Sequence, residues 1–167
     1  MRKFRSVNNA IRRTLECSFS TLTNPLNNKI PEDYTPYAIS VFEGRLDEEQ
    51  SEELLVNVSV SVDKERISKL NKFSIRLMSE FDAYSFKLAG IRKKNILYKE
   101  FTSKNAKIEY VTQVNMGNFK VLLPEIVAAY YEGYDYTNIL WLKGRNDNLA
   151  KIEYLANEYG LFLWNAS

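Results

Sequence analysis

Residues 122–141, LLPEIVAAYYEGYDYTNILW, form the most apolar and aromatic stretch of the chain, and the fold is predicted outward from them. The stretch holds four tyrosines and one tryptophan, and its three charged residues are all acidic. Leaving that much aromatic surface in water would forfeit roughly 25 cal/mol per Å². Most of this stretch is therefore expected to lie in the core or against a partner.

Two structures fit the middle of this stretch. Pro124 can start a helix that Gly133 ends, or Gly133 can be the bend of a β-hairpin that joins residues 127–131 to residues 138–142. Tyrosine and valine favour strands, so we prefer the hairpin and keep the helix as the alternative.

The chain before this stretch predicts helices and strands in alternation. An apolar stripe predicts a first helix over residues 5–17, and three prolines predict an irregular crossing over residues 18–36. A strand is expected at 37–42 and an acidic loop at 47–53. Valines alternate with polar residues at 54–62, which predicts a half-buried strand. Asp63 is expected to cap a long helix over 64–81.

Beyond residue 90 the pattern predicts a meander of strands and a final helix. Strands are expected at residues 96–101, 107–114, 119–123 and 139–143. Asp147 or Asn146 is expected to cap a helix that Gly160 ends, and residues 161–164 return as a strand. The fold class is therefore α+β: a single domain with a mainly antiparallel sheet and about three helices packed on one side.

Composition narrows the classes of function. The chain has 167 residues and no run of about 18 apolar residues, so we expect one domain that does not span a membrane. The start of the chain lacks a secretory signal and Cys17 is the single cysteine, so a cytoplasmic location is the default expectation. Histidine is absent, which removes the commonest catalytic bases and metal ligands. We expect no enzyme, no catalytic residue, no cofactor and no metal site. A carboxylate-dependent enzyme that uses Glu132 and Asp135 as an acid/base or metal pair is kept as a third hypothesis.

Charge is gathered into blocks. Residues 31–65 hold ten acidic and two basic residues, whereas residues 66–120 hold twelve basic and four acidic residues. The acidic block can dock on a basic partner, and the two acids of the tyrosine-rich bend add to it. The residues expected to bind a protein partner are Asp47, Glu48, Glu49, Glu52, Glu53, Tyr131, Glu132, Tyr134, Asp135, Tyr136 and Asn138.

The basic block supports an alternative. Its cations could follow a phosphate backbone while neighbouring aromatic rings stack on bases, although they could equally form a solvated helix face. The residues of this nucleic-acid alternative are Lys69, Lys72, Arg76, Arg92, Lys93 and Lys94.

In size, in its blocks of charge and in its acidic, tyrosine-rich bend, the chain resembles the small cytoplasmic proteins with which bacteria or their phages block one protein partner. Toxin-immunity proteins and phage inhibitors of host defence proteins are of this kind. The resemblance implies a non-enzymatic binding protein that neutralises a protein partner, a bacterial toxin first and a host defence protein second.

Overall fold

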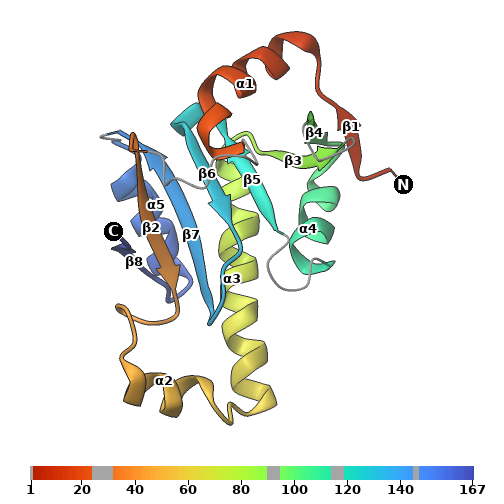
Figure 1. Ribbon diagram of the computed structural model, residues 1–167. Coiled ribbons are helices and arrows are strands. Elements are labelled where there is room, and N and C mark those ends of the chain that lie inside the picture. The colour runs from red at the N-terminus through yellow and green to blue at the C-terminus, as the bar shows by residue number, and fades with distance from the viewer. Residues whose placement is uncertain (1, 24–31, 90–94, 114–118, 145–146) are drawn as a thin grey trace.

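The computed structural model describes residues 2–23, 32–89, 95–113, 119–144 and 147–167, and its described strands form one antiparallel sheet (Figure 1). The strand order is β1-β4-β3-β5-β6-β7-β2-β8. The strands are β1 (Phe4–Ser6), β2 (Tyr34–Ser40), β3 (Tyr84–Ala89), β4 (Asn95–Phe101), β5 (Lys120–Leu123), β6 (Ala128–Tyr131), β7 (Thr137–Lys143) and β8 (Phe162–Asn165). The predicted α+β class and antiparallel sheet are confirmed.

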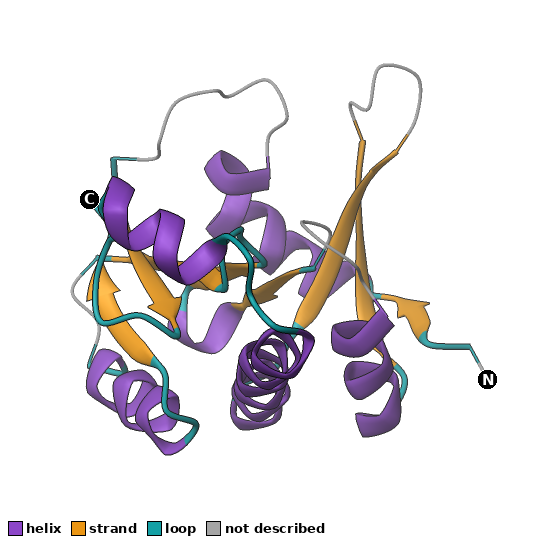
Figure 2. Ribbon diagram, turned by 90° about the horizontal axis from the view of Figure 1, so that it is seen from below, coloured by secondary structure: helices purple, strands orange, loops and turns teal. Residues whose placement is uncertain are grey.

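Helices cover both faces of this sheet (Figure 2). The helices are α1 (Asn9–Thr23), α2 (Glu48–Leu55), α3 (Val60–Glu80), α4 (Lys104–Gln113) and α5 (Leu149–Glu158). Helices α3, α4 and α5 contribute Phe73, Val111 and Ile152 to one core, so the expectation of three helices on one side holds for these. Helix α1 instead buries Leu15 and Phe19 against the opposite face. It lies there because alternate residues of the central strands make that face apolar too.

The predicted hairpin is confirmed. A short 3-10 helix, η2 (Pro124–Ile126), leads into β6, and β6 pairs with β7 so that Tyr131 lies opposite Ile139. Tyr130 is fully buried at the centre of the hairpin. Its hydroxyl lies 2.9 Å from the Ser74 hydroxyl of α3 and accepts a hydrogen bond of 2.6 Å from Asn138 Nδ2. Burial raises the pKa of Tyr130 to about 12, so the phenol is neutral at neutral pH.

The predicted strand over residues 54–62 is wrong. Helix α2 ends at Leu55, residues 56–59 form a turn, and α3 begins at Val60. The alternating valines do not line a core, since Val56 is 54% and Val60 is 69% exposed. The cap of α3 is Ser59, whose hydroxyl accepts from Val62 N at 3.4 Å, whereas Asp63 lies inside the first turn. The cap at Ser59 therefore starts a helix where the alternation of valines and polar residues predicted a strand.

The predicted acidic loop is also wrong, because residues 48–55 form α2. The Asp47 carboxylate accepts from Gln50 N at 2.8 Å and the Gln50 side chain accepts from Asp47 N at 3.1 Å. This reciprocal pair is a capping box, and Glu48 and Glu49 follow it in the first turn, where the helix dipole favours acids. The acidic residues alone indicated a loop, whereas the capping box at Asp47 and Gln50 favours a helix.

One further element has another type than predicted, and the bounds of α1 and β2 also differ from the predictions. Residues 107–114 were expected as a strand, but residues 104–113 form α4, whose start is capped by the Ser103 hydroxyl accepting from Ala106 N at 3.1 Å. The first helix begins at Asn9, after β1, and runs to Thr23, so the predicted irregular crossing begins too early and β2 already starts at Tyr34. Residues 24–31 lie outside the described residues.

The C-terminal part of the chain follows the prediction closely. Helix α5 ends before Gly160, whose φ of 66° supplies the left-handed stop, and β8 follows. The predicted cap is wrong for Asp147, because the N-cap residue of α5 is Asn148, which makes no side-chain cap hydrogen bond, and Asn146 lies outside the described residues. None of the described helices combines the length and the hydropathy that a membrane span requires.

Candidate partner-binding site

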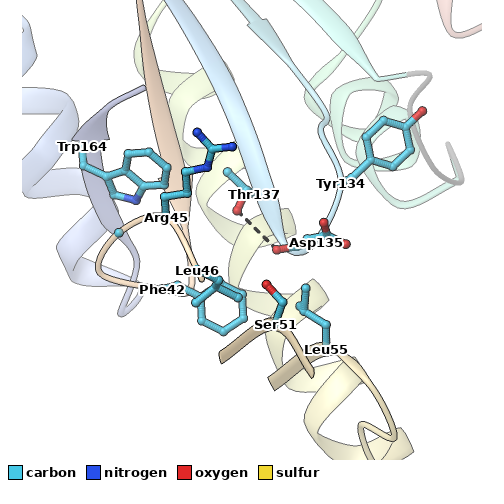
Figure 3. Close-up of a pocket in the computed structure, with 10 residues that line it drawn as sticks. Phe42, Arg45, Leu46, Ser51, Leu55, Tyr134, Asp135, Thr137 and Trp164 are labelled. Carbon is cyan, nitrogen blue, oxygen red and sulfur yellow. Dashed lines mark hydrogen bonds between the residues drawn. The ribbon is translucent and has the colours of Figure 1, made fainter. Parts of the chain in front are cut away.

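The acidic stretch and the tyrosine-rich bend meet at one end of the sheet, around a cavity of about 230 Å³ (Figure 3). Helix α2 provides Ser51 and Leu55, the bend provides Tyr134 and Asp135, and β8 provides Trp164. Four residues of the segment after β2 complete the wall: Phe42, Gly44, Arg45 and Leu46. We call α2, the segment 42–46 and the bend 132–136 the acidic face.

A second cavity of about 530 Å³ is lined by the same segment 42–46. It adds Gln50 and Leu54 of α2 and Phe162 of β8 to residues that the first cavity also uses. The acidic face therefore has two hollows, and each of them reaches β8.

Arg66 of α3 holds the parts of the acidic face together. Its guanidinium lies 5.1 Å from the centre of the Phe42 ring and 5.0 Å from the centre of the Tyr136 ring. It also donates to Leu54 O at 2.6 Å, while Tyr136 Oη donates to Asp63 Oδ1 at 3.0 Å. Through these contacts Arg66 connects three segments to helix α3: the bend, the segment after β2 and the end of α2.

The bend itself has an unfavourable backbone. Thr137 N donates to Tyr134 O at 2.9 Å, and the two central residues of this turn, Asp135 and Tyr136, have φ of 55° and 54°. A turn with two positive φ angles fits a hairpin but favours Asn-Gly over Asp-Tyr. The contacts of the Tyr136 side chain offset this cost. The turn presents Tyr134 to solvent, where it is 77% exposed.

The predicted partner-binding residues divide between scaffold and surface. Asn138 is buried and bonded to Tyr130, and Glu132 Oε2 accepts from Phe119 N at 3.3 Å. Tyr131 packs on Phe86 at the α1 side of the sheet, and burial raises the pKa of its phenol. These three residues shape the bend from within, whereas Tyr134 and Asp135 are exposed.

The acids of α2 are exposed as a group. Asp47 is used in the cap. The remaining acids are exposed and, among the residues that the structure describes, form no ion pair: Glu48, Glu49, Glu52 and Glu53. Their negative charge is thus available to a partner.

Arg45, Arg66 and Trp164 were not predicted as site residues. Figure 3 shows the Arg45 side chain between Trp164 and Thr137, and no carboxylate of the described residues pairs with it. Trp164 Nε1 is buried and lacks a hydrogen-bond acceptor among the described residues. A signal for Arg45 was present, since it is one of two basic residues within the acidic block. Nothing local to the sequence marks Trp164.

The residues of the nucleic-acid alternative are only partly placed. Lys69 pairs with Glu65 at 2.8 Å and Arg76 pairs with Glu80 at 3.1 Å, one helical turn along α3 in each case. Lys72 is exposed on the same helix. Arg92, Lys93 and Lys94 lie outside the described residues. Two of the three described cations therefore already have a partner within the helix.

The described residues contain no group of three or more His, Cys, Asp or Glu side chains that could hold a metal ion. Comparison with known proteins adds no assignment, because no family model, no curated protein and no solved structure matches this chain.

Proposed function

We propose that this protein is a non-enzymatic binding protein that neutralises a protein partner in the cytoplasm, as a bacterial toxin-immunity protein does. The acidic face would cover a basic surface of that partner. One observation carries the proposal: α2, through Ser51 and Leu55, borders the same cavity as the exposed Tyr134–Asp135 bend, which is far away in the sequence, and four exposed acids stand on that helix.

The chemistry of this face suits the capture of a cationic protein. Four carboxylates on one short helix, unpaired among the described residues, create a local negative field, which speeds the encounter with a positive patch. An exposed tyrosine beside the cavity adds rigid contact area, which is the usual anchor of a protein interface. Arg66 fixes these groups before binding, so little ordering is left for the moment of contact.

A phage-type inhibitor of a host defence protein would use the same contact. The two functions differ in the identity of the partner and not in the site, so they share one test.

The test compares two double charge reversals in the identified partner complex. The partner is captured by crosslinking in the native host, and its association rate is then measured with the wild-type protein and with E52K/E53K. Both positions lie in the last turn of α2, where lysine suits the helix dipole, so the helix should persist. We expect an association rate at least about tenfold lower and a loss of neutralisation.

The matched control is E153K/E158K, which makes the same change of charge at two exposed positions of α5. It should leave the rate within about twofold of wild type. Equal rates for both variants would remove α2 from the interface.

The nucleic-acid alternative stays a prediction with its own measurement. Anisotropy of a labelled random RNA or DNA duplex, titrated at low and at physiological salt, would show steeply salt-dependent binding if the basic block contacts phosphates. Binding of that kind would favour the alternative over the proposal.

A further inference from the structure

Strand β8 is an open edge of the sheet. It pairs with β2 alone among the described strands, and Ala166 N donates to Pro36 O at 2.9 Å just beyond it. Hydrogen bonds between antiparallel strands alternate along the pair, so Phe162 and Trp164 also bond to β2. The backbone N–H and C=O groups of Leu163 and Asn165 therefore point outward, where no described residue meets them.

This edge lacks the usual protection against pairing. Natural edge strands carry charges, prolines or bulges that prevent another strand from adding to them. The sequence of β8 is Phe-Leu-Trp-Asn, without charge or proline. At the other edge, β1 carries Arg5, which forms an ion pair of 2.6 Å with Glu100 of β4.

The side chains of β8 connect this edge to the acidic face. Phe162 and Trp164 point to the same side of the strand, and each lines one of the two cavities. Trp164 Nε1 is a buried N–H group that has no acceptor among the described residues, and the Trp164 side chain borders the cavity. The edge thus offers outward backbone groups and two hollows together.

We infer that the partner binds by adding an extended segment to β8, and this inference rests on the proposed function. The segment pairs with the outward groups of Leu163 and Asn165. Alternate side chains of an added strand point to opposite faces, so its lysines or arginines, whose stems are apolar, enter the cavities on the side of α2, while its apolar residues lie on the other face, beside Leu163. The occupant is a basic strand with apolar residues at every second position.

Charge selects a foreign strand over a second copy of this chain. A second copy joined through β8 would bring the uncharged segment Phe-Leu-Trp-Asn to this edge and no cation to the acids of α2, which are exposed and, among the described residues, unpaired. A cationic strand is attracted to the same edge by those acids.

The test uses the full chain and a labelled peptide, acetyl-Lys-Val-Lys-Val-Lys-Val-Lys-amide. Binding is measured by anisotropy, and the amide exchange of Leu163 and Asn165 is followed by NMR. Asn165→Pro removes the outward N–H, and Asn165→Ala is the matched control, since it loses the same side chain and keeps the N–H. Proline is tolerated on an edge strand when its missing N–H faces outward.

Strand addition predicts slowed exchange at both amides and binding about tenfold weaker in N165P than in N165A, as expected for a lost hydrogen bond. The inference is overturned if N165P and N165A bind alike without protection of these amides, or if the peptide does not bind at about 1 mM. Protection without peptide, together with a dimer in sedimentation, would place a second copy on the edge and also overturn it.

The same peptide separates this inference from the proposed function. If E52K/E53K weakens binding while N165P does not, the acidic face captures its partner without strand addition. If neither variant weakens binding, both proposals fail.

Discussion

The two ends of the sheet differ in how far their polar groups are satisfied. At the β1 end two cations are paired, with Lys3 3.3 Å from Glu109 and Arg5 2.6 Å from Glu100. Phe4 packs on Phe101 there, with ring centres 5.1 Å apart. At the β8 end the acids of α2 are unpaired among the described residues, and Trp164 Nε1 lacks an acceptor. The contacts of Lys3, Arg5 and Phe4 stabilise the first end, whereas the acids of α2 at the second end can pair with groups of a partner.

This difference shows that charge alone does not identify a binding surface. Basic residues are as strongly clustered in the sequence as the acids, but at the β1 end Lys3, Arg5 and Lys99 contact carboxylates or an aromatic ring of the same chain. A surface with unmet hydrogen-bonding and charge partners gains more from a second molecule than one whose groups are already paired.

Gly133→Ala should disturb the acidic end most. A Cβ at this position would lie 2.2 Å from Thr137 O, a backbone atom, so the bend must open to accept it. Such crowding costs about 1–3 kcal/mol, and it should also distort the cavity that Tyr134 and Asp135 border. Chemical denaturation measures the loss of stability. Gly44→Ala is the control, since a Cβ there meets nothing within 4 Å, and a similar loss in that variant would contradict the assignment of the effect to the bend.

Arg66→Met should loosen the acidic end while leaving the β1 end unchanged. The substitution keeps a long apolar side chain but removes the bond to Leu54 O and the two ring contacts, which together are worth about 1–3 kcal/mol. Hydrogen exchange should accelerate in α2 and the bend, and stay unchanged in β1 and β4. Arg76→Met, which breaks only an exposed pair on the same helix, should change stability by less than about 0.5 kcal/mol. Slow exchange retained in α2 of R66M would contradict the proposed role of Arg66.

Alkaline pH should act on the core that both ends share. Burial raises the pKa of Tyr130 to about 12 in the folded protein, while the unfolded chain ionises this phenol near its ordinary value of 10.0. The stability from the neutral phenol is therefore complete below pH 10 and falls as the pH rises toward 12, by about 2–3 kcal/mol. Denaturation curves from pH 9 to 12 would show this fall. Tyr130→Phe should be less stable at neutral pH because it loses the hydrogen bonds of the hydroxyl, but its stability should fall less at alkaline pH. If the free energy of unfolding falls as steeply with pH in this variant as in the wild type, ionisation of Tyr130 is not the cause.

Long periodic elements were predictable from the sequence, and elements set by capping were not. The helix over 64–81 and the hairpin at Gly133 follow from apolar spacing and from the preferences of tyrosine and valine. Helix α2 depends on two reciprocal hydrogen bonds between Asp47 and Gln50, and the start of α3 depends on Ser59. In that region the alternation of valines indicated a strand that local hydrogen bonding excluded.

The candidate site was predictable in its charge and not in its construction. The acids of α2 and the exposed bend residues were named from composition alone. The meeting of α2 and the bend around one cavity depends on Arg66, which contacts rings from two distant segments, Phe42 and Tyr136. The open edge at β8 depends on strand order, which requires long-range pairing that no local pattern encodes.

Hydrogen exchange of the whole chain, with and without the captured partner, tests the central claim most directly. The account predicts that protection gained on binding falls in α2, in the bend 132–136 and in β8, and that β1, β3 and β4 exchange as in the free protein. Protection confined to β1, β3 and β4 would place the partner at the β1 end and contradict the proposed function.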